Sequence, residues 1–327
     1  MFKKIILLAL SLSLVFFSSC KGEIQLEAQT QIALGTVCSI KLPKGTKNSV
    51  YEECFKILSN VEQEISRTRE DSYISVLNRD KKVQTNTEVF QLFEYAIDLA
   101  KESEGKFNIA MGKVVSLWDI GGSNQRIPSS LELNEAKIDY NEIILDKANL
   151  SISIPSNMEI DFGALGKGYA GDKLRDYLKS VELDKAIVNL GGNVLVIGNK
   201  SENQPWTIGL QDPNDIEKIF VALKVEDLSI VTSGTYERFF YQEGIKYHHI
   251  LDPNTLYPSE SDILSSTIIG KDSLICDSLS TTCFLLGREK ALEFMKNYED
   301  YSAFFLLSDN SIVTSDNFNY EYRVFEN

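Results

Sequence analysis

The sequence predicts an α+β fold built mostly from antiparallel sheets with flanking helices. Short strand-like stretches clearly outnumber helical stretches, and the two kinds do not alternate one for one, which disfavours a doubly wound parallel sheet. Of the 327 residues, 43% are hydrophobic and 24% are charged, as is typical of a chain that folds around a core. This length allows one large domain or two smaller ones.

The expected elements follow one another without a long linker, an internal repeat or a low-complexity tract. Residues 35–42 alternate like a strand, and apolar residues at helical spacing over 50–65 predict a helix. Thr85 and Glu88 have the spacing of a capping box, so we expect them to open a helix that ends near Gly105. Further short strands are expected over 152–154, 186–190, 194–197 and 206–210, with a terminal strand over 318–325.

Residues 1–19 are typical of a lipoprotein signal peptide. Two lysines precede an apolar run over residues 5–17, which is too short for a stable membrane span. The serines before Cys20 resemble the end of a lipobox, in which this cysteine receives lipid and becomes the first residue. An ordinary secretory peptide is the alternative. We therefore expect a tether over 20–27 and one domain over 28–327, anchored by lipid to a membrane of the cell envelope on its non-cytoplasmic, periplasmic side.

The charge and the cysteines exclude several function classes. With 33 basic and 47 acidic side chains, the formal charge is −14, which disfavours general nucleic-acid binding. No CxxC motif or Cys/His cluster supports a zinc or redox-dithiol site. Cys276 and Cys283 are too far apart along a helix for a disulfide and are expected to be buried, whereas the state of Cys38 and Cys54 stays open.

A glycine-rich segment over 161–172 is the first candidate for chemistry. It follows a strand-like stretch and runs into a predicted helix. Backbone N–H groups and Lys167 at such a helix start can approach phosphate oxygens. The glycine spacing fits neither a Walker loop nor a dinucleotide-binding fingerprint. A glycine-rich turn with a solvated lysine is the alternative.

Asp277 and Thr281 are the second candidate. On a helix they are one turn apart, so that a carboxylate and a hydroxyl share one face and can hold a hard cation. In isolation this spacing is far more often found in capping or surface residues. Asp277, however, lies in an otherwise apolar run, where a carboxylate needs a partner and a metal is one possibility.

His248 and His249, the two histidines of the chain, are the third candidate. Neighbours on a strand point to opposite faces, so at most one of them readily serves a given site. A neutral imidazole can take a proton from a hydroxyl nucleophile near neutral pH. A histidine that is hydrogen-bonded at the turn before Asp252 and Pro253 is the alternative.

Taken together, these segments resemble the ApbE family of flavin transferases over nearly all of residues 25–327. The similar stretches occur in the family's order across most of the chain, at residues 34–36, 72–78, 107–112, 161–172, 188–193, 232–238, 248–253 and 277–287. The resemblance implies a T-fold-like body that binds FAD between its parts, with Mg²⁺ on the pyrophosphate.

The resemblance also implies roles for individual residues. The carboxylate of Asp277, the hydroxyl of Thr281 and the carbonyl of Ala164 would be metal ligands, with Ser280 nearby. His249 would be the base, so that His249 and Asp277 are the expected catalytic residues. The expected contacts with FAD come from Leu34, Thr68, Ile109, Ala110, Met111, Asp161, Lys167, His249 and Leu251.

In the implied reaction, a threonine hydroxyl of an acceptor protein attacks the FMN-side phosphorus of FAD, and AMP leaves. FMN then stays on the acceptor through a phosphoester. Such chemistry needs charge neutralisation and in-line positioning. The family's acceptors include subunits of membrane NADH-linked and Rnf-type electron-transfer complexes outside the cytoplasm.

The chain departs from the family at Thr68, where an aromatic residue is common, and more mildly at Leu34, where methionine is commoner. Without the aromatic ring, water could compete with the acceptor threonine. An Mg²⁺-dependent FAD pyrophosphatase that releases FMN and AMP is therefore the second hypothesis. A flavin-binding lipoprotein without chemistry is the third, but the pairing of Asp277 with Thr281 argues against it.

Overall fold

The computed structural model describes residues 25–325. The expected signal peptide and the lipidation site Cys20 lie outside this part of the chain. Within residues 25–325, no helix combines the length and the apolarity needed to span a membrane.

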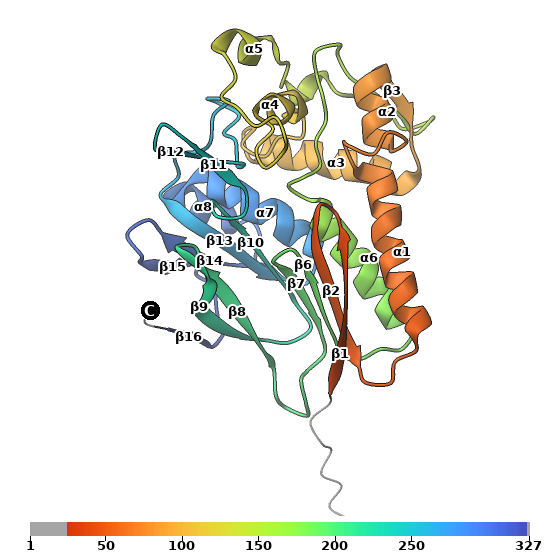
Figure 1. Cartoon of the computed structure of the whole chain (residues 1–327), viewed down its shortest axis with the longest axis vertical. Coiled ribbons are helices and arrows are strands. Elements are labelled where there is room, and N and C mark those ends of the chain that lie inside the picture. Colours follow the sequence, from red (N-terminus) through yellow and green to blue (C-terminus); the bar gives the residue numbers. More distant parts are fainter. Residues whose placement is uncertain (1–24, 326–327) are drawn as a thin grey trace, which may run out of the picture.

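An eight-stranded sheet forms the centre of the molecule (Figure 1). Every pairing within it is antiparallel, which confirms the predicted fold class. In spatial order its strands are β1 (Leu26–Ala33), β2 (Thr36–Pro43), β6 (Ala186–Leu190), β7 (Asn193–Ile197), β10 (Ser229–Gly234), β13 (Ile263–Gly270), β14 (Ser302–Leu307) and β15 (Ile312–Thr314).

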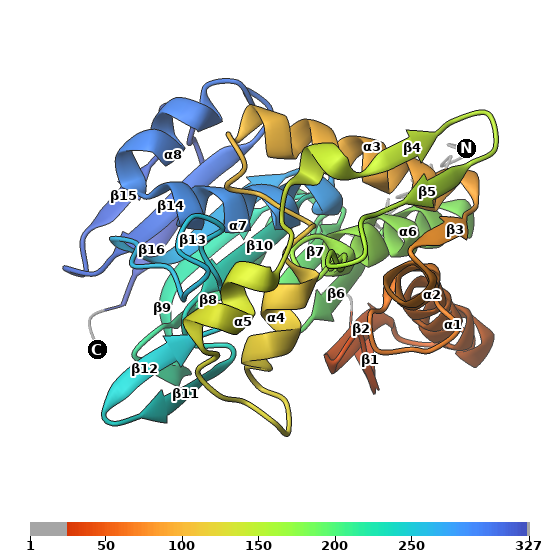
Figure 2. The ribbon, with the colours of Figure 1, turned by 90° about the horizontal axis from the view of Figure 1, so that it is seen from above.

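Helices cover one face of this sheet, where α1, α6 and α7 lie next to one another (Figures 1 and 2). Their buried side chains and those of the sheet form the largest hydrophobic core. The helices are α1 (Asn48–Ile65), α2 (Tyr73–Asp80), α3 (Thr87–Glu102), α4 (Gly112–Trp118), α5 (Ser130–Glu135), α6 (Gly166–Ser180), α7 (Ser273–Leu286) and α8 (Arg288–Met295), with a 3₁₀ turn at Tyr140–Glu142.

Three smaller sheets complete the described chain. The sheet of β8, β9 and β16 packs on the opposite face of the main sheet through a second hydrophobic cluster that includes Trp206 and Phe304. The hairpin of β11 and β12 packs near α4, with Tyr247 against Trp118. The strands are β3 (Lys82–Gln84), β4 (Ile144–Asp146), β5 (Ser151–Ser153), β8 (Trp206–Asp212), β9 (Asp215–Val225), β11 (Phe239–Gln242), β12 (Ile245–His248) and β16 (Tyr322–Val324).

The predicted N-cap of α3, Thr85, is one residue too early. The N-cap of α3 is Asn86, whose side chain accepts a hydrogen bond from the N–H of Val89 at 2.8 Å. Thr85 instead donates to the carbonyl of Leu150. Asparagine is as good an N-cap as serine and better than threonine, so the helix begins after the asparagine. Its predicted end near Gly105 is confirmed by the bond from Gly105 N to Ala100 O at 2.7 Å.

Two further expectations can be compared with the structure. The terminal strand is shorter than predicted and covers only Tyr322–Val324, paired with β9. The cysteines of the described chain are all buried and free, as expected for Cys276 and Cys283 and now also found for Cys38 and Cys54.

The helices α6 and α7 approach each other closely at Gly168. A Cβ atom built on this residue would lie 2.7 Å from Asp277 Cβ and 2.7 Å from Leu274 Cα. Because one of these neighbours is backbone, it has no way to move aside. The glycine is therefore required by the packing of the two helices.

We expect Gly168→Ala to lower the free energy of unfolding by about 3 kcal/mol, because the added methyl group forces the helices apart. Urea denaturation followed by circular dichroism measures the change. Gly166→Ala is the control, since its Cβ would meet only the flexible end of Ile65 at 3.0 Å. Equal losses in both variants would contradict the close approach at Gly168.

Candidate active site

The carboxylate of Asp277 is buried where α6, α7 and β7 meet. The residue is 3% exposed. Its Oδ2 accepts a hydrogen bond from the N–H of Gly168 at 2.8 Å, and its Oδ1 accepts one from Asn193 Nδ2 at 2.9 Å. Burial raises the pKa of Asp277, while the charge of Lys167 and the two hydrogen bonds oppose this rise. The position of the carboxylate is thus fixed from two sides.

Thr281 lies one turn after Asp277 on α7 and is held by a serine of β10. The hydroxyl of Ser233 lies 3.1 Å from Thr281 Oγ1 and 2.8 Å from Ser280 Oγ. Ser280 is buried and donates to the backbone carbonyl of Asp277 at 2.8 Å. Thr281 is partly exposed. Of the expected ligands Asp277 and Thr281, the threonine is therefore the more accessible residue.

Ala164 lies in the turn before α6. The first hydrogen bond of this helix joins Tyr169 N to the carbonyl of Leu165. The N–H of Gly168, which a longer helix would direct to Ala164, goes to Asp277 instead. The carbonyl of Ala164 therefore lies just outside the helix and does not accept the N–H of Gly168.

The glycine-rich segment differs from a cradle of free N–H groups. The N–H groups of Leu165 and Gly166 donate to the carbonyl of Phe162, and that of Gly168 donates to Asp277. These three N–H groups are therefore not free to bind a phosphate. Lys167 Nζ lies 3.7 Å from Glu237 Oε2 and supplies the positive charge of the segment.

Asp161 and the turn at residues 109–111 lie together. The N–H of Asp161 donates to the carbonyl of Ile109 at 2.9 Å, and Ile109, Ala110 and Met111 are all buried. The carboxylate of Asp161 lies 2.9 Å from Arg67 Nε. This ion pair attaches the loop after α1 to the start of the glycine-rich segment.

Leu34 and Thr68 lie in turns near the C-terminal end of α1. Leu34 has a φ of +54°, and its N–H donates to Glu62 Oε1 at 2.8 Å. Such a backbone conformation is unusual for leucine and is held here by the carboxylate. Thr68 is exposed, and its hydroxyl lies 3.1 Å from that of Ser66.

The two histidines have different surroundings. His248 is buried, with Nε2 3.0 Å from the carbonyl of Ser259. His249 follows β12, and its Nδ1 lies 3.3 Å from the carbonyl of Arg238. Burial and, secondly, the charge of Lys167 lower the pKa of His249 to about 3. Its ring is therefore neutral at physiological pH.

The remaining expected contact, Leu251, is buried in a small cluster with Met111 and Trp118. Two expected contacts with FAD are thus placed together in a cluster apart from the main core. The cluster is also where the β11–β12 hairpin packs, so it joins the turn at residues 109–111 to the segment that carries His249.

The oxygen atoms around Asp277 fit a hard cation. Among residues 25–325, no group of three or more His, Cys, Asp or Glu side chains could hold a metal ion. A cation here would therefore need one carboxylate together with the Thr281 hydroxyl and the Ala164 carbonyl. These are donors that Mg²⁺ accepts. Each carboxylate oxygen has one donor inside the protein, which leaves lone pairs for a metal.

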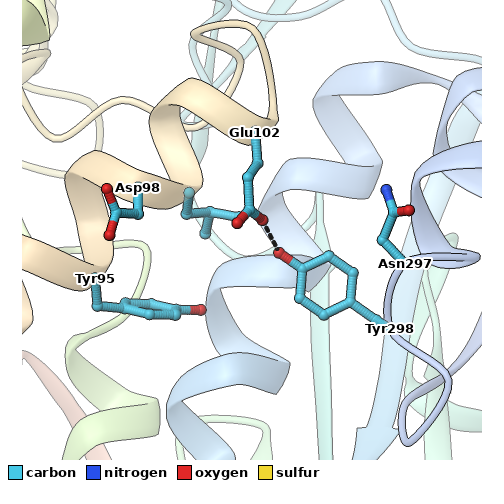
Figure 3. Close-up of a pocket in the computed structure, with 6 residues that line it drawn as sticks. Tyr95, Asp98, Glu102, Asn297 and Tyr298 are labelled. Atoms are coloured by element: carbon cyan, nitrogen blue, oxygen red, sulfur yellow. Dashed lines mark hydrogen bonds between the residues drawn. The ribbon is translucent and has the colours of Figure 1, made fainter.

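A separate cavity of about 450 Å³ lies between α3 and the turn after α8 (Figure 3). Tyr298 donates to Glu102 there at 2.6 Å. No residue expected in the active site lines this cavity. Its link to that site is the contact between the hydroxyls of Tyr95 and Ser278, the residue after Asp277.

Several residues of the site had no predicted role. Arg67 contacts Asp161, Asn193 contacts Asp277, and Ser233 contacts Thr281. Glu237 contacts Lys167, and Arg238 donates to the carbonyl of Gly35. All of these residues except Arg67 lie in stretches that resemble the family, over 188–193 and 232–238. The resemblance therefore marked their segments but not their functions.

Comparisons with known proteins identify the family of this chain. The model of the ApbE family matches residues 34–305. The FAD:protein FMN transferase of Treponema pallidum is 32% identical, over 91% of this chain and 89% of its own. That of Klebsiella pneumoniae is 36% identical, over 80% of this chain and 83% of its own.

Solved structures show the same architecture. The ApbE protein of Thermotoga maritima superimposes with a TM-score of 0.82 at 30% identity, covering 89% of this chain and 97% of that protein. The flavin transferase ApbE of Vibrio cholerae gives a TM-score of 0.79 at 25% identity, covering 90% of this chain and 98% of its own. Since the family match extends over most of the chain and relatives above 30% identity cover nearly all of it, this protein is an enzyme of the transferase type and belongs to the ApbE family.

Proposed function

We propose that this protein transfers FMN from FAD to a threonine of an acceptor protein, with Mg²⁺ as cofactor and AMP as the leaving product. The observation that carries this proposal is the arrangement around Asp277. A fixed carboxylate and a threonine hydroxyl one turn apart lie against the start of α6, which brings Lys167. The names of the relatives from Treponema and Klebsiella support FAD as substrate and a protein as acceptor.

Asp277, Thr281 and Ala164 would hold the cation. Ser280 would support this set from the same helix, since it donates to the backbone carbonyl of Asp277 and shares the Ser233 hydroxyl with Thr281. When bound, Mg²⁺ would neutralise charge on the pyrophosphate and stabilise the departing phosphate of AMP. The chain itself adds Lys167, whose ammonium group can contact a phosphate oxygen. Local positive charge is required because the protein as a whole carries a charge of −14.

His249 would accept the proton of the attacking threonine. Its low pKa keeps the ring neutral and thus able to accept a proton. The contact of Nδ1 with the Arg238 carbonyl fixes the ring when that nitrogen carries the hydrogen, which leaves Nε2 as the acceptor. Leu34, Asp161, Leu251 and the turn at 109–111 would bind the nucleotide and flavin parts of FAD.

The location and the partners are further parts of the proposal. We propose that Cys20 carries a lipid and that the enzyme works on the periplasmic side of a membrane. Its acceptors would be flavoprotein subunits of membrane electron-transfer complexes. Mass spectrometry of the membrane-extracted protein tests the anchor, and a mature chain without lipid on Cys20 would refute it.

The proposed reaction is tested by incubating the pure protein with FAD and Mg²⁺, with and without an acceptor fragment. Transfer predicts flavin fluorescence on the acceptor in a denaturing gel and release of AMP only when the acceptor is present. Release of AMP without the acceptor indicates hydrolysis. If neither AMP nor flavinylated acceptor forms, the result supports a protein that binds flavin without chemistry.

We expect Asp277→Asn to lower the Mg²⁺-dependent rate by at least about 100-fold, because the amide keeps the shape but loses the charge that holds the cation. Release of AMP at saturating FAD, measured over a range of Mg²⁺ concentrations, gives the rate. Asp98→Asn, an exposed carboxylate on α3, is the control. An unchanged rate for Asp277→Asn at saturating Mg²⁺ would refute its role as a ligand.

We expect His249→Gln to lower the rate of transfer by about 100-fold or more while the affinity for FAD changes little, because a general base acts on the attacking hydroxyl. Since the pKa of His249 in the folded protein lies far below the usual 6.5, kcat/KM for the acceptor should show no inflection from this group between about pH 5 and 8. An inflection near pH 6.5 that disappears in the variant would contradict the lowered pKa.

The exposed, polar Thr68 favours FAD hydrolysis as a second candidate function, since no aromatic ring stands at this position to exclude water. We expect Thr68→Tyr to raise the ratio of flavinylated acceptor to free FMN. Thr68→Val, which removes the hydroxyl at similar volume, serves as the control. An equal ratio in all three proteins would show that this position does not control access of water.

A further inference from the structure

Asn193 holds the candidate metal ligand and has one side-chain atom without a partner. The residue is the first of β7 and is 5% exposed. Its Nδ2 donates to Asp277 Oδ1 at 2.9 Å. Its Oδ1 is buried and accepts no hydrogen bond from any residue in the described part of the chain. A buried acceptor without a donor is unfavourable and therefore requires an explanation.

The unpaired oxygen follows from the contact with Asp277. An ionised carboxylate only accepts hydrogen bonds, so the amide must present its nitrogen to it and turn its oxygen away. Both amide atoms are bonded to the same carbon, so this oxygen lies close to the carboxylate. The unpaired acceptor is thus located beside the candidate metal site.

The backbone before Asn193 leaves little freedom to relieve this situation. Gly191 and Gly192 form the β6–β7 turn with φ of +61° and +98°, conformations that favour glycine. The N–H of Gly192 donates to Asn189 Oδ1 at 2.8 Å, which closes the turn. Asn193 is therefore presented by a rigid hairpin, and its amide points to Asp277 because of the fold.

A hydrated cation would supply the missing donor. Mg²⁺ usually keeps several of its water molecules when it binds a protein, and these waters need acceptors. Residues that contact ligands and waters from outside orient the ligands and affect metal affinity.

We propose that Asn193 is a positioning residue for the cation: Nδ2 fixes the Asp277 carboxylate, and Oδ1 accepts a hydrogen bond from a water molecule on the metal. This inference rests on the proposed function, in which Asp277 binds a divalent cation. It adds a residue that acts through Asp277 and through water without ligating the metal directly.

The test measures metal binding without FAD and without catalysis. Full-length protein is titrated with Mn²⁺, and the free ion is measured by electron paramagnetic resonance. We expect Asn193→Ala to weaken Mn²⁺ binding by about 10-fold or more. Asn199→Ala is the matched control, because Asn199 also has a buried Oδ1 without a partner, whereas the amide that donates to Asp277 is that of Asn193. Its affinity should stay within about twofold of that of the unmodified protein.

A second variant and a second readout separate positioning from a purely structural role. Asn193→Asp places two carboxylates in contact, and a cation relieves their repulsion. The rise in Tm on adding Mn²⁺ should therefore be at least as large in Asn193→Asp as in the unmodified protein, and smaller in Asn193→Ala. If Asn193→Ala does not fold, the comparison with Asn193→Asp still decides.

The outcomes distinguish the two proposals. Equal Mn²⁺ affinity in the unmodified protein and Asn193→Ala, or a lower metal-free Tm with an unchanged metal-induced rise, would overturn the role of Asn193 alone. Absence of Mn²⁺ binding by the unmodified protein would overturn the metal site on which the proposed function depends.

Discussion

The arrangement of the candidate site depends on the burial of one carboxylate. An ionised group inside a protein is tolerated only when hydrogen bonds or charges replace its water. Asp277 receives these from Gly168 and Asn193, which are 109 and 84 residues away in the sequence. The requirement to satisfy this carboxylate therefore fixes the start of α6, the second turn of α7 and the start of β7 relative to one another. Each of these elements also carries or adjoins another residue of the site.

The same contact explains how an acidic protein presents positive charge at one place. The close approach at Gly168 brings the start of α6, with its partial positive charge, against the helix that carries Asp277 and Thr281. Lys167 lies at the start of α6. Its ammonium group is 3.7 Å from Glu237 Oε2, so this carboxylate neutralises the lysine charge only in part. A cation would add to this charge. Under the proposed function, phosphate binding would therefore depend on the few groups that the helix contact brings together, which act against the negative net charge.

Sequence patterns predicted those features that depend on neighbours along the chain. The helix over residues 50–65 and the strands around Gly191 were predictable because burial repeats at a fixed spacing. The predicted N-cap of α3 was wrong because Thr85 and Asn86 both suit that position, and only tertiary contacts decide between them. The contacts of Asn193 and Ser233 with α7 join residues far apart in sequence, and no local pattern encodes them. Local patterns and the resemblance to a family supplied the candidate residues, but the order of the strands and the hydrogen bonds required the structure.

The glycine-rich segment shows that a local pattern does not determine what its N–H groups bind. In a phosphate-binding loop, free N–H groups at a helix start bind the ligand directly. Here the N–H of Gly168 binds Asp277, and the glycine itself is required for helix packing. Under the proposed function, the anion would be bound through a cation on Asp277 and through Lys167. If Mg²⁺ binds as proposed, phosphate binding would depend on the metal, which would suit the proposed reaction because its departing group is itself a phosphate that must be stabilised.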